Sequence, residues 1–474
     1  MTVDPAVIVI GAGMTGIAAG YYLRESNIPY VILEAKSDLG GVWNTHRWHG
    51  ARCDSDFIKY SFSFRPFLSA QCLQPRETIQ AYLRSVAEEF AILPHIRFDT
   101  LVEKAVFHPA ERRWSVHTNR GVLRAQFIVN GNGYFSDEPH IPEFPDAQRF
   151  RGELIHTSRL DGARSFADRK VVLVGSGATA ICCAPELARV SKSLVLLQRS
   201  PSYIYEIDNR AGALIRSCQQ LYRLGIHSAV KWLRHYLQLR DDLIFVAFRR
   251  LPALARWIFR RHWAGAVPEE ALRRDFTPRY NPWEQRIAVA IGLKEKLQSG
   301  AIRMKTGEIE RFTESGIVLK SGEQLECDTC ILATGLNLRF FSFDMYVGNR
   351  KIALERINFY KGLLVGGIPN YFHPMGSWHS AWTQRLEPVL RLAIRIMRHM
   401  ARRGHESFSI DRCELPAAPG ITPNYVLRSL ATMPRLHGTC DLPSIDNLFA
   451  VRFDARELRF ESPVHGIPGA PVLA

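Results

Sequence analysis

The sequence predicts an α/β fold, because two stretches far apart in the chain share one pattern of residues. Each stretch reads as a strand, a glycine-rich turn and a helix: VIVIGAGMTGIAAG from Val7 and VVLVGSGATAICCA from Val171. Four-residue apolar runs fit strands that are buried on both faces of a parallel sheet. Because the two turns begin about 164 residues apart, we expect two separate Rossmann-like dinucleotide-binding domains.

The first turn has the glycines that a dinucleotide pyrophosphate requires. Gly11 permits a tight turn, Gly13 lets the backbone approach the phosphates, and Gly16 lets helix and strand pack closely. The N–H groups and positive dipole end of the following helix then face the phosphates. The candidate contacts in this turn are Gly11, Gly13, Met14, Thr15 and Gly16.

An acidic residue follows the second strand of this unit. The apolar strand Tyr30–Leu33 ends in Glu34, about 20 residues after the glycines. A carboxylate at this position binds a ribose 2′-hydroxyl and repels a 2′-phosphate. The first unit therefore suits FAD or NAD and not NADP.

The second unit has the opposite charge at the corresponding place. Its turn has the form G-x-G-x-x-A, and the strand Leu194–Leu197 is followed by Gln198, Arg199 and Ser200 with no acid. An arginine beside a hydroxyl suits the 2′-phosphate of NADPH, although Arg199 could also be a solvated strand end. The candidate NADPH contacts are Gly175, Ser176, Gly177, Ala178, Thr179, Arg199 and Ser200. FAD and NADPH sites in one chain describe a flavoprotein that takes hydride from NADPH.

We expect the chain to divide at the proline-rich stretch Pro139–Pro145 and again after the strand Cys330–Leu332. Residues 1–145 would form the first part of the FAD-binding domain and residues 146–335 the NADPH-binding domain. Residues 336–474 would complete the FAD-binding domain. A helical insertion at about 205–275 interrupts the NADPH-binding domain, because apolar residues recur there at helical spacing.

Composition places the chain among soluble globular proteins. Of 474 residues, 46% are hydrophobic and 23% charged, and no apolar run approaches the roughly 20 residues that a membrane helix needs. The N-terminus runs directly into the first strand, so we expect no signal peptide. Nine cysteines without framework spacing favour a reducing, cytoplasmic compartment. Cys327 and Cys330 lack a second ligand pair, so we expect small core residues there and no metal site.

The insertion carries about half of the net charge of +15, with ten Lys/Arg against two acids over residues 211–265. Nucleic-acid motifs are absent, so we expect no nucleic-acid partner. The apolar side of its helices needs a cover: its own domain, a second subunit, or an anionic membrane. We favour packing on the domain or a subunit, in a cytoplasmic enzyme whose insertion helps to wall the substrate entrance. The oligomeric state stays open.

With these motifs the chain resembles the class B flavoprotein monooxygenases. The family motif F-x-G-x-x-x-H-x-x-x-(W/F/Y) is matched at Phe150, Gly152 and His156, but Leu160 replaces the aromatic. A second motif, of type I Baeyer–Villiger monooxygenases, is matched at Gly40, Gly41, Trp43, Gly50 and Asp54, with Trp48 and His49 in place of its aromatic–Pro pair. The stretches DFTPRYNPWEQR, ILATGLN and SWHSAWT are similar to the ethionamide-activating branch of that family.

The resemblance implies a small-molecule monooxygenase that uses O₂. Flavin reduced by NADPH would form a C4a-peroxide with O₂, which attacks a ketone to give an ester or lactone. The resemblance points to Arg279 as the cation beside this peroxide and to Asp54 as the residue that orients Arg279. Further candidate flavin contacts are Glu34, Gly41, Trp43, Asp54 and Val102. His156 would make a hinge hydrogen bond between domains, or else act as a catalytic base.

Two other functions remain open. Oxygenation of a nitrogen or sulfur atom would use the protonated peroxide as an electrophile, and in related enzymes it accompanies an Asn-Thr-like pair after the tryptophan loop. This chain has Asp54-Ser55-Asp56 there, which favours ketone oxygenation. A redox-regulated binding protein that retains FAD without turnover is the third possibility, and the complete motifs at both sites argue against it.

Overall fold

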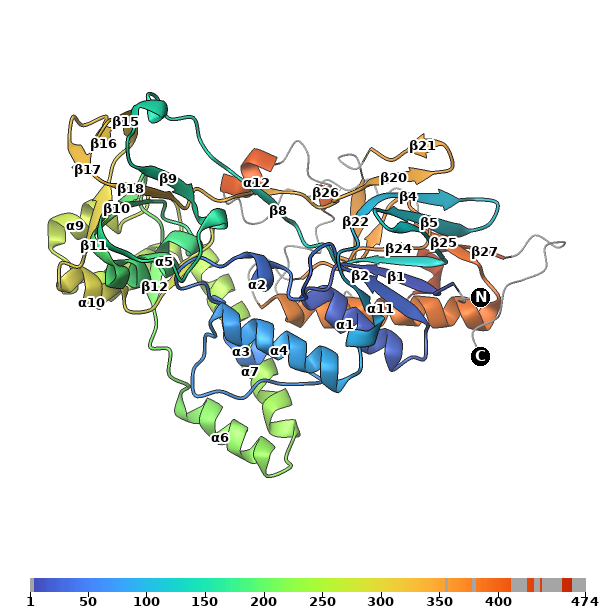
Figure 1. Cartoon of the computed structure of the whole chain (residues 1–474). Coiled ribbons are helices and arrows are strands. Elements are labelled where there is room, and N and C mark those ends of the chain that lie inside the picture. The colour runs from blue at the N-terminus through green and yellow to red at the C-terminus, as the bar shows by residue number, and fades with distance from the viewer. Residues whose placement is uncertain are drawn as a thin grey trace.

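A computed structural model describes residues 4–353, 357–376, 381–410, 424–429, 435–436 and 454–462. Two lobes, each built on its own parallel sheet, lie side by side, with helices α6 and α7 projecting below them (Figure 1). The right-hand lobe in that view contains both the N-terminal strand and the long helix α11 (Trp382–Arg403). Segments from both ends of the chain therefore build one lobe.

The sheet of this first lobe is centred on β1, whose residues are all buried. β1 pairs in parallel with both β2 and β7, and an antiparallel extension lies beyond β24. Alternate side chains point to opposite faces, as strand geometry requires. In order across the sheet the strands are β26 (Arg435–Leu436), β22 (Asn358–Tyr360), β23 (Leu364–Val365), β24 (Tyr371–Phe372), β7 (Phe127–Asn130), β1 (Val7–Ile10), β2 (Tyr30–Leu33) and β3 (Ile96–Arg97).

Each face of this sheet has its own cover. Val7 and Val9 pack against the helices α1 (Met14–Arg24), α4 (Arg76–Glu89) and α11, whereas Ile8 and Ile10 pack against a second sheet. The strands of that covering sheet are β21 (Arg350–Lys351), β20 (Asp344–Val347), β4 (Val102–His108), β5 (Arg113–Thr118) and β6 (Gly121–Ala125). The predicted strands over 102–107 and 114–117 belong to it. A short pair, β25 (Ser407–Ser409) with β27 (Arg459–Glu461), lies beyond α11.

The second lobe repeats the design with a five-stranded parallel sheet. Helix α5 (Ala178–Val190) and the short α10 (Leu293–Gln298) cover one face, and a small antiparallel sheet covers the other. The main strands in order are β14 (Ile302–Thr306), β11 (Ser191–Gln198), β10 (Phe166–Val174), β18 (Thr329–Leu332) and β9 (Glu153–His156). The covering strands are β15 (Ile309–Thr313), β16 (Gly316–Leu319) and β17 (Gln324–Glu326). Cys327 and Cys330 are buried here, and Cys330 lies within β18.

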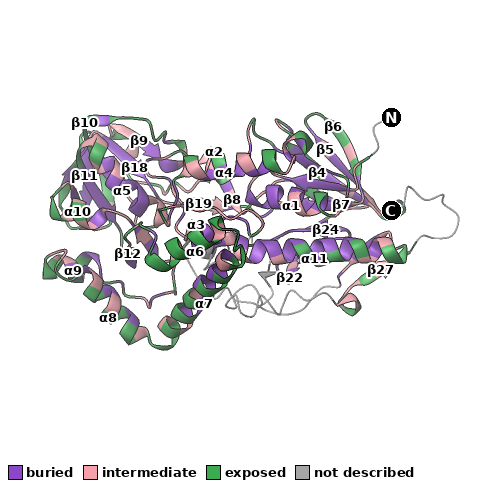
Figure 2. Cartoon of the chain, turned by 90° about the horizontal axis from the view of Figure 1, so that it is seen from below, coloured by how far each residue is buried: buried purple, intermediate pink, exposed green. Residues whose placement is uncertain are grey.

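The insertion is helical. Its elements are α6 (Ala213–Arg223), α7 (Ser228–Arg250), α8 (Pro252–Trp263) and α9 (Glu269–Asp275). They lie in the chain between β12 (Ile204–Glu206) and β13 (Ala288–Ala290), which pair as a two-stranded sheet. Viewed from below, α7 and α8 form a V on the underside of the molecule (Figure 2). No helix among the described residues is long and apolar enough to cross a membrane.

The segments between the lobes have more structure than the sequence indicates. The proline-rich connection begins in a strand, because β8 (Phe135–Pro139) pairs with β19 (Leu336–Leu338) in a two-stranded bridge. The stretch 40–54, which contains the motif residues Gly40 to Asp54, includes the short helix α2 (Val42–Thr45), and α3 (Phe57–Tyr60) follows it. Beyond 410 the remaining helix is α12 (Asn424–Ser429). Part of the SWHSAWT segment, residues 377–380, lies outside the described residues.

Candidate active site between the two lobes

A cavity of about 1030 Å³ lies between the two lobes and is lined by both glycine-rich turns. It lies at the carboxyl ends of β1 and β10, where parallel α/β sheets bind their ligands. Among the predicted site residues, Gly16, His156 and Arg279 do not line it. One space therefore reaches both predicted cofactor sites.

Gly16 has a packing role instead. A Cβ built on Gly16 would lie 1.8 Å from the carbonyl oxygen of Gly11, so no side chain fits at the start of α1. Gly11 itself has φ +89°, in the region that favours glycine, and a Cβ there would lie 2.8 Å from the Gly131 oxygen. The turn thus keeps α1 close to β1, with the helix N-terminus directed at the cavity.

Glu34 directly follows β2 and lines the cavity. Its Oε2 accepts a hydrogen bond of 2.7 Å from the Ala12 N–H, and its Oε1 accepts one of 2.9 Å from the Lys36 N–H. Burial raises the pKa of Glu34, and these backbone donors act in the opposite direction. The carboxylate borders the cavity at the place where a ribose of FAD would lie, and it would repel a 2′-phosphate.

The second turn is built in the same way and leaves more room. A Cβ on Gly175 would lie 2.5 Å from the Ala333 oxygen, whereas one on Gly177 would meet no atom within 4 Å. The backbone at Gly177 is therefore open to an approaching pyrophosphate. Arg199 and Ser200 lie exposed at the end of β11 and line the cavity, as a 2′-phosphate site requires.

A second arginine lines the same cavity from a distant part of the chain. Arg428 is on α12, and its pKa is lowered by burial and, to a smaller extent, by the positive charge of Arg199. Two like charges near one another on a cavity wall fit an anion between them. The sequence carries no motif around Arg428, so only the folded arrangement identifies it.

The segment around Trp43, residues 40–45, forms part of the cavity wall next to the first glycine-rich turn. Gly41 has φ +56°, and a Cβ there would lie 3.1 Å from the Gly13 Cα, so the two backbones approach closely. Trp43 donates from Nε1 to the Tyr60 hydroxyl at 3.0 Å, which fixes the indole against the first lobe. Val102, at the start of β4, also lines the cavity.

Asp54 forms an ion pair with Arg286 and not with the expected Arg279. The Arg286 guanidinium donates to Asp54 Oδ2 at 2.5 Å, and both residues line the cavity. Arg279 is exposed and lies outside the cavity. The expected contact between Asp54 and Arg279 is thus absent from the structure.

The path of the chain explains this difference. Tyr280 is held inward by the Tyr203 hydroxyl, which donates to its carbonyl oxygen at 2.8 Å. The Asn281 N–H then donates to the Glu284 carboxylate at 3.0 Å, closing a turn in which Trp283 has φ +70°. This turn directs Arg286 into the cavity and leaves Arg279 on the outer side.

His156 lies at the end of β9, beside the strand β18, and does not line the cavity. Its Nδ1 accepts from the Ser158 N–H at 3.1 Å, and burial lowers its pKa to about 4. The ring is therefore neutral near pH 7. This placement between the second sheet and the connection fits the expected hinge position better than a catalytic base.

Two further segments and one tryptophan line the cavity, although they are not among the site residues predicted from the sequence. They are the glycine-rich segment after β7 at 131–135, the Ala333-Thr334-Gly335 stretch after β18, and Trp382 at the start of α11. The first two follow parallel strands, so the NGNG and ATG patterns could have indicated them. The Trp382 ring stacks on Tyr134 at 5.2 Å, a contact between residues far apart in sequence.

Comparison with known proteins shows which proteins this chain is similar to. A family model described as pyridine nucleotide-disulphide oxidoreductase matches residues 8–221. The FAD-containing monooxygenase EthA of Mycobacterium tuberculosis is 33% identical over 451 residues, covering 92% of each chain. The probable FAD-binding monooxygenase AlmA of Acinetobacter baylyi is 28% identical, covering 97% of this chain and 95% of its own.

Solved structures share the fold over nearly the whole chain. An oxidised steroid monooxygenase bound to NADP superposes with a TM-score of 0.76 at 24% identity, covering 97% of this chain and 100% of that chain. An open crystal structure of cyclohexanone monooxygenase gives 0.78 at 20% identity, with 97% and 99% covered.

The fold and the paired sites define a two-domain flavoprotein monooxygenase that uses FAD and NADPH. Within that class, the chain belongs to the FAD-containing monooxygenase family of EthA.

Proposed function

We propose that this enzyme inserts one oxygen atom of O₂ beside a ketone carbonyl, giving an ester or lactone. The observation that carries this proposal is the Arg286–Asp54 pair, which lies in the cavity shared by the two cofactor sites. Arginine stays charged at every working pH and donates several hydrogen bonds. A fixed cation of this kind suits chemistry in which negative charge develops on a carbonyl oxygen.

Asp54 positions the guanidinium and Arg286 acts on the substrate. The carboxylate accepts from one terminal nitrogen of Arg286, and both side chains line the cavity. Bound FAD, once reduced by NADPH, supplies the oxygen-transfer chemistry with O₂. Arg286 would then stabilise the charge that addition places on the ketone oxygen, an effect of roughly 3–4 kcal/mol for one donor.

The remaining predicted residues hold the two cofactors in this proposal. Glu34 and the first glycine turn, with Gly41, Trp43 and Val102, would hold FAD. Arg199 and Ser200 would hold the 2′-phosphate of NADPH, with Arg428 as a further cation. The seven cysteines of the described part of the chain are free thiols, which supports a cytoplasmic location.

Two arginine variants test the cation assignment. Arg286→Ala should keep its bound flavin and still oxidise NADPH, while ketone oxygenation falls by roughly 10²–10³-fold. Arg279→Ala is the matched control from the same segment, and it should retain near wild-type oxygenation because its side chain lies outside the cavity. Loss of ketone oxygenation in Arg279→Ala with retention in Arg286→Ala would reverse the assignment.

Product analysis tests the reaction class. The wild-type enzyme is supplied with NADPH, ¹⁸O₂ and a panel of ketones and thioethers, and the products are identified by mass spectrometry. We expect one ¹⁸O atom in an ester or lactone. Sulfoxides in the absence of any ester or lactone would assign the enzyme to heteroatom oxygenation instead.

A further inference from the structure

Helix α7 carries apolar residues on two opposite sides. Val230, Leu233 and Leu237 face inward and pack on Ile58 of the first lobe. Trp232, Tyr236, Leu239 and Leu243 recur on the other side at intervals of four and three residues, which places them on one helical face. Their side chains are 55%, 42%, 45% and 59% exposed. This second face is therefore uncovered.

The exposed face continues onto the next helix. Leu254 and Trp257 on α8 are 48% and 61% exposed. Together with the four residues of α7 they form what we call the outer stripe: Trp232, Tyr236, Leu239, Leu243, Leu254 and Trp257. Exposed residues run along both arms of the V in Figure 2.

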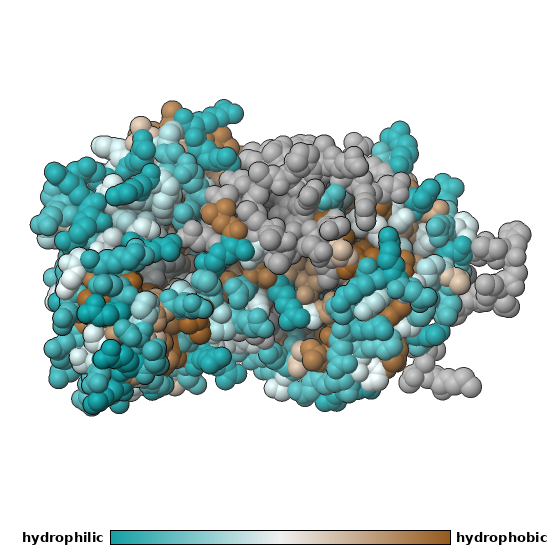
Figure 3. Space-filling view, turned by 90° about the horizontal axis from the view of Figure 1, so that it is seen from above, coloured by the Kyte–Doolittle hydropathy of each residue, from teal (hydrophilic) through white to brown (hydrophobic). Residues whose placement is uncertain are grey.

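Exposed apolar residues concentrate in this one region. Of the nineteen large hydrophobic residues found exposed in the described part of the chain, twelve lie between Leu214 and Trp257. Among the coloured residues of the opposite side, seen from above in Figure 3, most are hydrophilic and the brown ones lie in small groups. Such a concentration of exposed apolar residues in one region indicates an interaction site.

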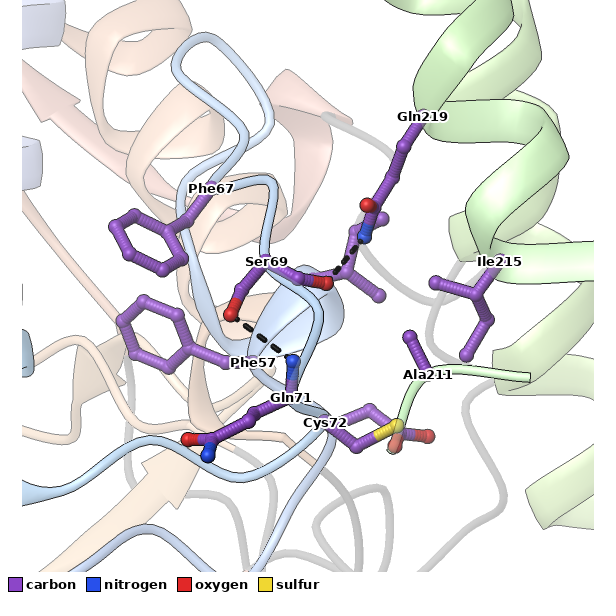
Figure 4. Close-up of a pocket in the computed structure, with 10 residues that line it drawn as sticks. Phe57, Phe67, Ser69, Gln71, Cys72, Ala211, Ile215 and Gln219 are labelled. Carbon is purple, nitrogen blue, oxygen red and sulfur yellow. Dashed lines mark hydrogen bonds between the residues drawn. The ribbon is translucent and has the colours of Figure 1, made fainter. Parts of the chain in front are cut away.

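The insertion already packs on the first lobe through its inner side. The outer stripe therefore does not serve to attach the insertion to the rest of the chain. The buried Arg234 lies 3.5 Å from buried Glu387 on α11 and donates to the Ser61 oxygen at 2.7 Å. On α6, Gln219 donates to the Ser69 oxygen at 2.9 Å (Figure 4). The cavity enclosed at that contact, about 10 Å³, has room for no more than a water molecule.

The insertion also does not wall the cofactor cavity. None of the described residues that line this cavity comes from 211–275. The insertion therefore does not form the expected wall at this cavity. The exposure of the outer stripe needs another explanation.

The charge around the outer stripe indicates which class of partner could bind there. The exposed basic residues beside it are Lys231, Arg249, Arg250, Arg256, Arg260 and Arg261, of which Arg260 is paired with Glu269. Of the two acids in this stretch, Asp242 is buried, and Asp241 is paired with Lys59 and Arg240. A second copy of the chain would bring two positive surfaces together in a symmetric interface, which like charges oppose.

We propose that the outer stripe docks on an anionic phospholipid surface. Indole and phenol rings suit the boundary between headgroups and acyl chains, and arginines beside them suit lipid phosphates. The contact is peripheral, with α7 and α8 lying along the membrane plane. It would bring the enzyme to substrates that partition into lipid.

Vesicle flotation at physiological ionic strength tests this proposal. The purified holoenzyme should float with phosphatidylglycerol-containing vesicles and remain behind with pure phosphatidylcholine vesicles. The variant Trp232→Gln/Leu243→Gln/Trp257→Gln should lose vesicle binding by roughly tenfold or more, because it removes the three most exposed side chains of the stripe. Val122→Gln/Ile141→Gln/Leu154→Gln is the matched control, since these residues are exposed apolar positions outside the insertion.

Flavin content and NADPH oxidation with a water-soluble substrate establish that the variants are folded. Equal flotation of wild type with anionic and neutral vesicles would overturn the proposal, as would undiminished binding by the outer-stripe variant. A lipid-free dimer that the outer-stripe variant abolishes would assign the surface to a second copy and overturn it too.

Discussion

The two glycine-rich turns differ at their third position. In the first turn this position is Gly16, where a Cβ would lie 1.8 Å from the Gly11 oxygen. In the second turn it is Ala180, whose methyl group is fully buried in the core of its lobe. Helix α1 is therefore packed more closely on its strand than α5. The same backbone motif therefore accepts either glycine or alanine at its third position, and this residue indicates how closely the helix can approach the strand.

The two turns differ again at the end of the next strand. Glu34 is buried and held by two backbone N–H groups, while Arg199 is exposed on the cavity wall and has Arg428 nearby. In the function proposed above, the turns would provide similar pyrophosphate sites, and the strand ends would set the preference at each ribose. Four changes would break or sharpen this contrast.

The largest effect is expected from Gly16→Ala. Its methyl group would overlap the Gly11 carbonyl, so the helix must move, at a cost of at least about 3 kcal/mol. We expect little folded protein, or folded protein without FAD, as measured by thermal unfolding and absorbance at the flavin band. Ala180→Gly is the matched change in the second turn and should cost only about 1 kcal/mol. Equal losses in the two variants would contradict the packing difference.

Arg199→Ala should weaken the discrimination between the two nicotinamide cofactors. Loss of one charge-assisted contact with the 2′-phosphate removes about 1.5–3 kcal/mol, which raises KM for NADPH by roughly 10- to 150-fold. KM for NADH should change little, because NADH lacks this phosphate. Steady-state kinetics with both cofactors measures the effect, and equal losses would show that the phosphate lies elsewhere.

Glu34→Gln should weaken FAD binding. The amide oxygen can still accept from the Ala12 N–H, but the charge that strengthens a ribose hydrogen bond is gone, at a cost of about 1–1.5 kcal/mol. We expect roughly a tenfold rise in the FAD dissociation constant, measured by reconstitution of the apoprotein. Unchanged FAD affinity would remove Glu34 from the ribose site. Wild-type protein should be yellow and contain FAD, not FMN.

Arg428→Ala should give the smallest change of the four. Its guanidinium lies on the same cavity wall as Arg199 but is exposed to solvent, so its contribution to 2′-phosphate binding is about 1 kcal/mol. KM for NADPH should rise about fivefold with KM for NADH unchanged. Arg428→Lys keeps the charge and should recover part of the loss. An equal effect on both cofactors would give Arg428 a purely structural role.

Local patterns in the sequence account for much of the fold. The strands at 7–10, 30–33 and 127–130 and the helices over 76–89 and 382–403 lie where their apolar spacing predicts. Short-range information suffices for these elements, because side-chain periodicity decides which faces are buried. The helix α2 and the bridge of β8 with β19 were not predicted, since four residues of helix or a two-stranded pairing leave no clear periodicity.

The sequence by itself determined the two strand–turn–helix units, and it predicts opposite preferences for FAD and NADPH at their strand ends. Each preference follows from residues close together in the chain, a glycine turn and the end of the following strand. Only the tertiary structure decided that Arg286 and not Arg279 meets Asp54, that Arg428 lies near Arg199, and that the outer stripe of α7 is exposed. These features depend on which distant segments come into contact, and helical spacing cannot tell a buried apolar face from an uncovered one.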